Sequence, residues 1–284
     1  MSGYFAVSGF EKLDAKEYGI KRFLRLYPAY WASLIIVYPL TILYLPSRAV
    51  GFKEFILNFT MLQTLFGARD VDGAYWTLLC ELLFYIIVFL ICFTNNKRKF
   101  QYFILAYAFG LVCLNLFSLF GMFETICKVN DMMYLYCFMI GTVISLIKQC
   151  CITNKTQKAL VIVALIVFIA QQFISHDFKS GIYLTFSTAI LVGAIYLWEL
   201  YPIGKNSFWV KLVSFIASIS YPIYLLHQNI GYMILQYFEN LGYNNELIIL
   251  LPIFITLLLA SIIHYTVEVP IGKITFKICD AINR

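Results

Sequence analysis

The sequence predicts an all-α membrane protein, a polytopic bundle of about eight transmembrane helices after a short N-terminal stub. Of its 284 residues, 62% are hydrophobic and only 13% are charged, which is more apolar surface than a soluble fold of this length can bury. The apolar residues form continuous runs of roughly 17 to 25, the length of helix that crosses a hydrocarbon core of about 30 Å. Barrel strands would alternate polar and apolar residues instead.

The predicted spans are joined by short polar connections, so we expect residues 1–284 to form a single membrane domain. In chain order the spans are Leu26–Leu45, Tyr75–Thr94, Phe100–Phe120, Asp131–Ile147, Lys158–Ile174, Gly181–Leu200, Leu212–Tyr237 and Glu246–Val269. Most of the 21 Lys and Arg residues lie in alternate connections, as the positive-inside rule requires. We therefore expect a multi-pass protein of the inner (plasma) membrane with a cytoplasmic C-terminus, whose partner is the lipid bilayer and not nucleic acid.

The stub Met1–Phe10 is too short to cross the membrane, and it has neither the basic region nor the cleavage site of a signal peptide. Its sequence is typical of the inner end of a helix whose beginning is missing, or of a frayed terminus at the interface. The eight cysteines show no CxxC spacing and the three histidines are spread along the chain. We expect structural thiols and no metal site.

Two ionisable residues lie well inside predicted spans, where a charge costs roughly 2.5 to 3.5 kcal/mol on insertion scales. Glu81 lies about two turns into the second span, and His227 lies past the middle of the seventh. Both are expected in the outer half of the membrane, where they could share one polar cavity and act as catalytic residues in proton transfer. The alternatives are a carboxyl that bonds to a neighbouring Tyr or Trp, and a neutral histidine buried between helices.

A basic cluster precedes the first full span. Arg22 and Arg25 are three residues apart and are predicted to share a helix face, with Lys21 beside them. Such a forked cationic surface suits phosphate. The alternative is a topogenic anchor that contacts lipid headgroups.

Three further ionisable residues, Glu199, His264 and Glu268, lie near the cytoplasmic ends of predicted spans. At these positions side chains can reach the headgroups. Glu268 has additional interest because it closes the last span two residues before Pro270, a residue that stops helices.

Short motifs follow one another at defined intervals along the chain. The segment Phe5–Phe10 is similar to FFVLSGF, and Arg22–Trp31 matches RxxRLYPxYW. The pattern WSLxxExxFY is matched by Trp76, Leu78, Glu81, Phe84 and Tyr85. The pattern SYxxYLxH is matched by Ser220, Tyr221, Tyr224, Leu225 and His227, and the closing ExP by Glu268 and Pro270. In this order and spacing the motifs resemble acyltransferase family 3, the membrane O-acyltransferases that include O-antigen and exopolysaccharide acetylases.

The resemblance implies that a cytoplasmic acyl-CoA, with acetyl-CoA the expected donor, supplies an acyl group that passes across the membrane to a hydroxyl of a cell-surface glycan or lipid-linked saccharide. No bound cofactor is expected. The donor phosphates would be held by Lys21, Arg22, Arg25 and Tyr27. Glu81 and His227 would belong to a polar transfer cavity, and its substrate-lining residues would be Trp76, Tyr85, Ser220, Tyr224 and Glu268.

The chain departs from the family pattern at its start. The family's first helix carries an Arg or Lys and a histidine regarded as the catalytic base, and the sequence begins after that helix. We expect an N-terminally truncated chain, and the alternatives are a misplaced start and an inactive protein.

Two other functions remain open from the sequence. The first is a proton-coupled transporter or flippase for a lipid-linked sugar or small solute, in which Glu81 and His227 form a proton relay. Such proteins are expected to have repeated halves or broken short helices, and the sequence indicates neither. The second is a noncatalytic membrane scaffold.

Overall fold

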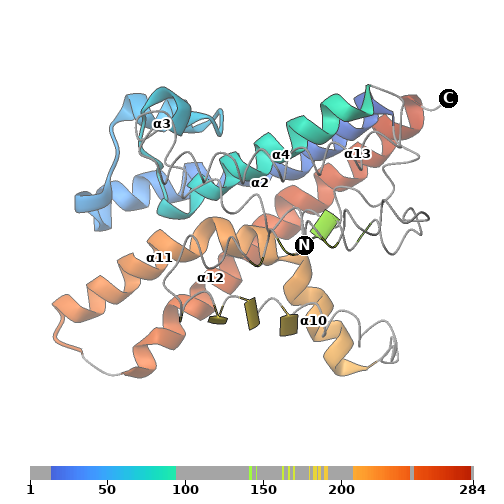
Figure 1. Cartoon of the computed structure of the whole chain (residues 1–284). Coiled ribbons are helices and arrows are strands. Elements are labelled where there is room, and N and C mark those ends of the chain that lie inside the picture. Colours follow the sequence, from blue (N-terminus) through green and yellow to red (C-terminus); the bar gives the residue numbers. More distant parts are fainter. Residues whose placement is uncertain are drawn as a thin grey trace. The chain divides into compact units, whose positions relative to one another are not determined.

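The computed structural model describes residues 14–93, 207–243 and 246–282, together with isolated positions between 141 and 190 (Figure 1). Within these residues the regular elements are helices and turns with no strand, so the predicted all-α class is confirmed. The chain divides into two compact units, of which one comprises residues 16–82 and 205–284 and the other residues 1–15 and 83–204. The pocket and contacts described below lie in the first of these units.

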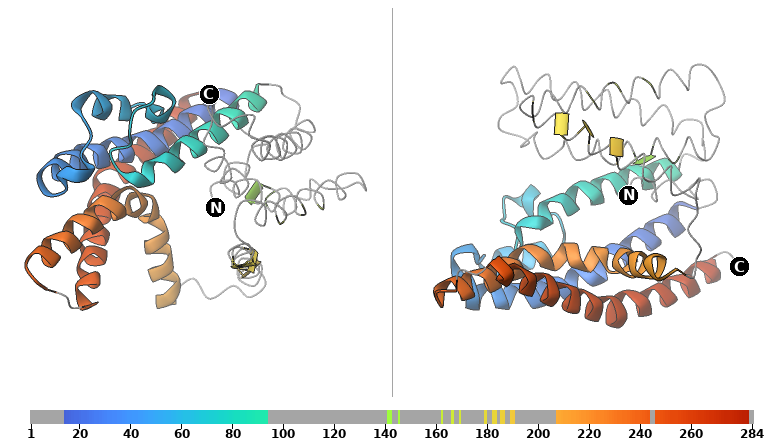
Figure 2. Two further views of the ribbon diagram at one scale, coloured as in Figure 1. Left: turned by 60° about the vertical axis from the view of Figure 1, so that its left-hand side comes forward. Right: turned by 90° about the horizontal axis from the view of Figure 1, so that it is seen from below.

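The principal helices are α2 (Ala15–Tyr44), α3 (Phe52–Asn58), α4 (Trp76–Cys92), α10 (Phe208–Ser218), α11 (Ser220–Asn240), α12 (Leu250–Ile263) and α13 (Val269–Ile282). Short 3₁₀ turns cover Pro46–Arg48, Gln63–Phe66, Gly73–Tyr75 and Glu246–Ile249, and a π-helical turn, His264–Glu268, joins α12 to α13. Figure 2 shows α2 and α13 running beside each other and α11 next to α12.

Among the described residues, three helical stretches are long and apolar enough to cross a membrane, and α10 and α11 add a fourth if the bent pair counts as one span. The three are Ala15–Tyr44, Gly73–Cys92 and Glu246–Ile282. Four predicted spans, Phe100–Phe120, Asp131–Ile147, Lys158–Ile174 and Gly181–Leu200, lie outside the described residues apart from isolated positions. The total of eight spans therefore stays a prediction.

The predicted span Leu212–Tyr237 is not one continuous helix. It is bent by 63° between α10 and α11, at Ile219. The cause lies one turn further on, at Pro222, which has no N–H to donate to the carbonyl of Ser218 and whose ring would collide with that carbonyl in a straight helix. A broken helix, which the sequence did not indicate, is thus present.

The last helix also differs from its predicted end at Val269. It continues through Pro270 to Ile282, because the π-helical turn changes the bonding register before the proline. The Val269 N–H donates to the carbonyl of His264, five residues back, and Pro270 falls in the first turn of α13, where a missing donor is tolerated. The full stretch of 37 residues is about 55 Å long at 1.5 Å per residue, so it extends beyond a hydrocarbon core of about 30 Å.

The connection between α2 and α4 is a folded segment built around Asn58, which is fully buried. Its side-chain amide donates to the carbonyls of Glu54 and Arg69, and its Oδ1 accepts from the Val71 N–H at 3.1 Å. The Tyr30 hydroxyl donates to the Asn58 carbonyl at 2.7 Å. These bonds fix the connection on α2 and so position the start of α4.

Candidate active site

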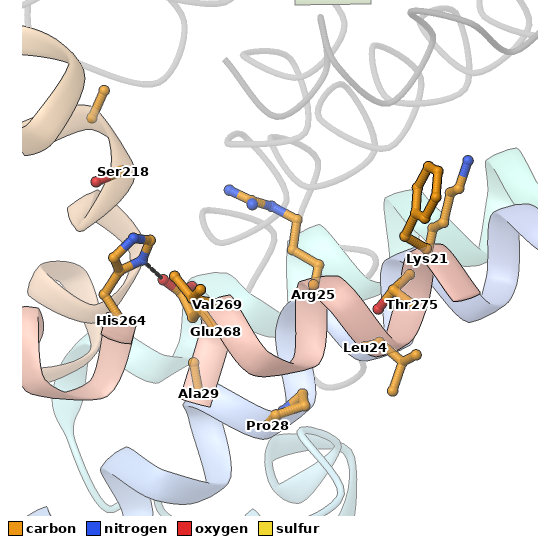
Figure 3. Close-up of a pocket in the computed structure, with 13 residues that line it drawn as sticks. Lys21, Leu24, Arg25, Pro28, Ala29, Ser218, His264, Glu268, Val269 and Thr275 are labelled. Atoms are coloured by element: carbon orange, nitrogen blue, oxygen red, sulfur yellow. Dashed lines mark hydrogen bonds and ion pairs between the residues drawn. The ribbon is translucent and has the colours of Figure 1, made fainter. Parts of the chain in front are cut away.

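A pocket of about 520 Å³ lies between α2, the end of α10, the π-helical turn and α13 (Figure 3). This volume is in the range of small-molecule sites. The α2 residues that line it come from the basic cluster and the turn after it, Lys21, Leu24, Arg25, Pro28 and Ala29. The other lining residues are Ala217, Ser218, His264, Glu268, Val269, Gly272, Thr275 and Phe276.

Two cations of the basic cluster, Lys21 and Arg25, line the pocket. Only the first of them forms an ion pair with a described carboxylate. The Lys21 ammonium lies 2.6 Å from a carboxylate oxygen of Glu17, a side chain that is 7% exposed. Arg25 is exposed, and among the described residues no carboxylate forms an ion pair with it. Arg25 is therefore the cation of this pocket whose charge is available for an anionic ligand.

The other two predicted phosphate-binding residues lie elsewhere on α2. The Arg22 guanidinium lies over the ring of Tyr18, 5.0 Å from its centroid, and Arg22 does not line the pocket. The Tyr27 hydroxyl donates to the carbonyl of Thr60 at 3.0 Å, and its ring stacks on Phe23. Lys21 and Arg25, four residues apart on α2, thus line the pocket together, whereas the predicted pair Arg22 and Arg25 does not.

A histidine and a carboxylate face the cations from the π-helical turn. The Nδ1 of His264 and the Oε2 of Glu268 are 2.7 Å apart, and their side chains are 17% and 15% exposed (Figure 3). Glu268 was predicted as a cavity residue, whereas His264 was expected only to reach the headgroups. The spacing His-x-x-x-Glu, which places both side chains on one helix face, is the signal that could have identified the pair.

Tyr221, in the first turn of α11, contacts the basic motif of α2. Its hydroxyl donates to the carbonyl of Leu26, within the basic motif, at 3.0 Å. The basic motif on α2 and the motif that begins α11 are thus hydrogen-bonded to each other.

The two predicted catalytic residues, Glu81 and His227, lie at different levels of the helix pair α4–α11. The two segments run antiparallel, since Asp72 accepts from the N–H of Asn229 and Tyr75 donates to the carbonyl of Leu225. Glu81 lies six residues after Tyr75, further from the level of His227. Tyr221 and His227 are six residues apart, which is about 9 Å along a helix axis. Glu81 is accordingly closer to the level of the pocket, and His227 is closer to the start of α4.

His227 is held in a helical turn that is clamped from the start of α4. Tyr75 donates through its hydroxyl to the carbonyl of Leu225, and the Asn229 N–H donates to Asp72. These are the two backbone groups that a regular α-helix joins to each other. The His227 ring is exposed, and its Nδ1 is 2.8 Å from the carbonyl of Tyr224.

The remaining predicted cavity residues are not gathered in the pocket. The Tyr224 hydroxyl donates to the backbone carbonyl of Ala74, in the 3₁₀ turn just before α4. The Ser220 hydroxyl donates to the carbonyl of Ala217, a pocket residue, at 2.8 Å. Trp76 is half-buried in the first turn of α4, and Tyr85 is buried and belongs to the other compact unit. Their assignment as substrate-lining residues stays a prediction.

Within the part of the chain that the structure describes, no three His, Cys, Asp or Glu residues form a group that could hold a metal ion. Residues 1–266 match the family model described as an acyltransferase domain, that of acyltransferase family 3. Comparisons with curated proteins and with solved structures gave no match.

Proposed function

This chain belongs to acyltransferase family 3, and we propose that it transfers an acyl group, in the simplest case acetyl, from acyl-CoA to a hydroxyl. The acceptor is a cell-surface glycan or a lipid-linked saccharide, and the protein acts in the inner membrane with its C-terminus in the cytoplasm. Acyl-CoA is a substrate in this proposal, so no resident cofactor is needed. Glu81 and His227 are candidate polar groups on the path of the acyl group.

The observation that supports this proposal best is the composition of the pocket. Lys21 and Arg25, from the basic motif near the N-terminus, line it together with Glu268 from the closing motif. A guanidinium without a carboxylate partner suits a phosphate group, to which it can donate two parallel hydrogen bonds. Coenzyme A carries several phosphates, whereas acyl transfer needs polar side chains close to the thioester. The pocket offers both kinds of group.

Acyl-CoA kinetics with two arginine variants test the proposal. We expect R25Q to raise the KM for acyl-CoA roughly ten- to a hundredfold, because one charge-assisted hydrogen bond to a phosphate contributes about 1.5 to 3 kcal/mol. R22Q is the matched control, since it removes the same charge three residues away on the same helix but outside the pocket lining. The measurement uses the full chain in membranes, with quantification of the protein in each sample. Equal KM values for R25Q and R22Q would contradict this assignment of the donor site.

The break between α10 and α11 is a feature that transporters share. In this chain Ala217 and Ser218, which immediately precede the break, line the pocket, so the bend has a role in forming the donor site. Comparing the consumption of acyl-CoA with a proton-coupled flux separates the two functions. Flux without acyl-CoA consumption would favour a transporter.

A further inference from the structure

We propose that the pocket holds the pantetheine arm of the donor as well as its phosphates, with Glu268 and His264 accepting hydrogen bonds from the amide N–H groups of that arm. Pantetheine connects the phosphates of coenzyme A to the sulfur of the thioester, and it contains two amide groups. This inference rests on the proposed acyl transfer and deepens it, because it states how the donor lies in its site.

The pocket is elongated along two helical segments. Its α2 residues extend from Lys21 to Ala29, and its residues on the π-helical turn and α13 extend from His264 to Phe276. At about 1.5 Å per residue these stretches are roughly 12 Å and 18 Å long. Gly272 lines the pocket between the ends of the second stretch, and a Cβ at this position would meet no neighbouring atom within 4 Å. The pocket therefore has room for an extended ligand that lies along the helices.

The two ends of the pocket differ in charge. Lys21 and Thr275 lie at one end (Figure 3). His264 and Glu268 lie at the other end, and Arg25 lies between the two. A phosphate is attracted by a guanidinium and repelled by a carboxylate, so the donor phosphates are expected near Lys21 and Arg25. The end that carries Glu268 is left for an uncharged part of the same molecule.

That second end offers two hydrogen-bond acceptors. A carboxylate can only accept, so the 2.7 Å contact between Oε2 of Glu268 and Nδ1 of His264 places a hydrogen on Nδ1. Nε2 of the neutral ring is then an acceptor, as is Oε1 of Glu268. Among the described residues, neither of these two atoms has a hydrogen-bond partner. Because the two side chains are mostly buried, amide N–H groups of a ligand would meet acceptors that water reaches poorly.

The direction of the donor follows from the predicted topology. Helix α2 is expected to enter the membrane from the cytoplasm, so Ala29 lies about 12 Å deeper than Lys21 along the helix. Ala29 is at the same end of the pocket as Glu268 (Figure 3). The thioester has to point into the membrane, because the acyl group leaves in that direction, and the adenosine stays on the cytoplasmic side. The pantetheine arm, and not the adenine, is thus beside Glu268 and His264.

Dissociation constants for coenzyme A and for its nucleotide half, measured on the purified full chain in detergent, test this inference. The nucleotide half is adenosine with all the phosphates of coenzyme A and without the pantetheine arm. We expect E268Q to weaken the binding of coenzyme A roughly ten- to a hundredfold, because the glutamine can present an NH₂ group where an acceptor is needed. The same variant should not weaken the binding of the nucleotide half.

Two other variants complete the comparison. R25Q is expected to weaken the binding of both ligands, because both carry the phosphates. T266V is the matched control and should weaken neither, because Thr266 is exposed on the same π-helical turn and its hydroxyl bonds to the helix carbonyl of Ile262.

H264A separates ligand binding from a structural role of the pair. It removes Nε2 and is expected to weaken coenzyme A but not the nucleotide half, whereas a deformed pocket would bind both ligands less well. The inference is overturned if E268Q binds coenzyme A like T266V, or if E268Q and H264A weaken both ligands by the same factor. It is also overturned if the wild type binds both ligands equally tightly. A wild-type chain that binds neither ligand would instead refute the proposed function itself.

Discussion

Replacing Asp72 with alanine is expected to loosen the contact between α4 and α11. Asp72 is fully buried, and its carboxylate accepts from the N–H groups of Ala74 and Asn229, both at 2.9 Å. Burial raises the pKa of this carboxyl, and the two hydrogen bonds act in the opposite direction. The D72A variant removes the charge and leaves two N–H groups without their acceptor.

The magnitude follows from these two groups. A buried donor that loses its partner costs about 1 to 3 kcal/mol, so the two together amount to about 2 to 6 kcal/mol. The lower end applies if the Asn229 N–H turns to the carbonyl of Leu225, four residues back, as in a regular helix. At about 2 to 4 °C per kcal/mol for a chain of this size class, the melting temperature should fall by roughly 4 to 24 °C.

Thermal unfolding of the purified full chain in detergent, followed by tryptophan fluorescence, measures this effect. E239Q is the control, because Glu239 is exposed at the end of α11 and loses the same charge without a buried partner. If D72A melts at the same temperature as E239Q, the reasoning that Asp72 ties α11 to the start of α4 is refuted.

Two further variants probe this region and the connection before it. A Cβ at Gly73 would lie 2.7 Å from Nε2 of Gln228, so G73A should lower the free energy of unfolding by about 1 kcal/mol as the flexible amide moves. In a chain that already carries Q228A, G73A should have no such cost. An equal loss of stability with and without Q228A would count against the clash. Glu54 has its pKa lowered from 4.5 to about 2, chiefly by the Arg69 side chain, so its contribution to stability is complete above pH 4.5 and is lost as the pH falls towards 2. The difference in melting temperature between wild type and E54Q should therefore disappear over that interval, and a difference that is independent of pH would contradict the pairing.

The helical class and several helix positions follow from local pattern. A continuous apolar run of the right length has one stable form in a bilayer, because unpaired backbone groups are too costly in hydrocarbon. The predicted spans Leu26–Leu45 and Tyr75–Thr94 therefore correspond to α2 and α4. No neighbour in space is needed for this conclusion.

Two prolines of the later helices, Pro222 and Pro270, show where local pattern fails. Pro222 lies near a bend of 63°, whereas the helix passes through Pro270 by means of a π-helical turn. Both prolines lack the same N–H. The presence of a proline alone therefore does not decide whether the chain bends or changes its bonding register.

The sequence by itself determined that this is a helical membrane protein of acyltransferase family 3, because hydrophobic length and motif order are properties of the chain alone. Only the tertiary structure decided that Arg25, and not Arg22, faces a pocket, and that His264 belongs to it. The physical reason is that hydrogen bonding and electrostatic attraction act over a few ångströms in space. Lys21 and Glu268 are distant along the chain, and folding makes them line one cavity.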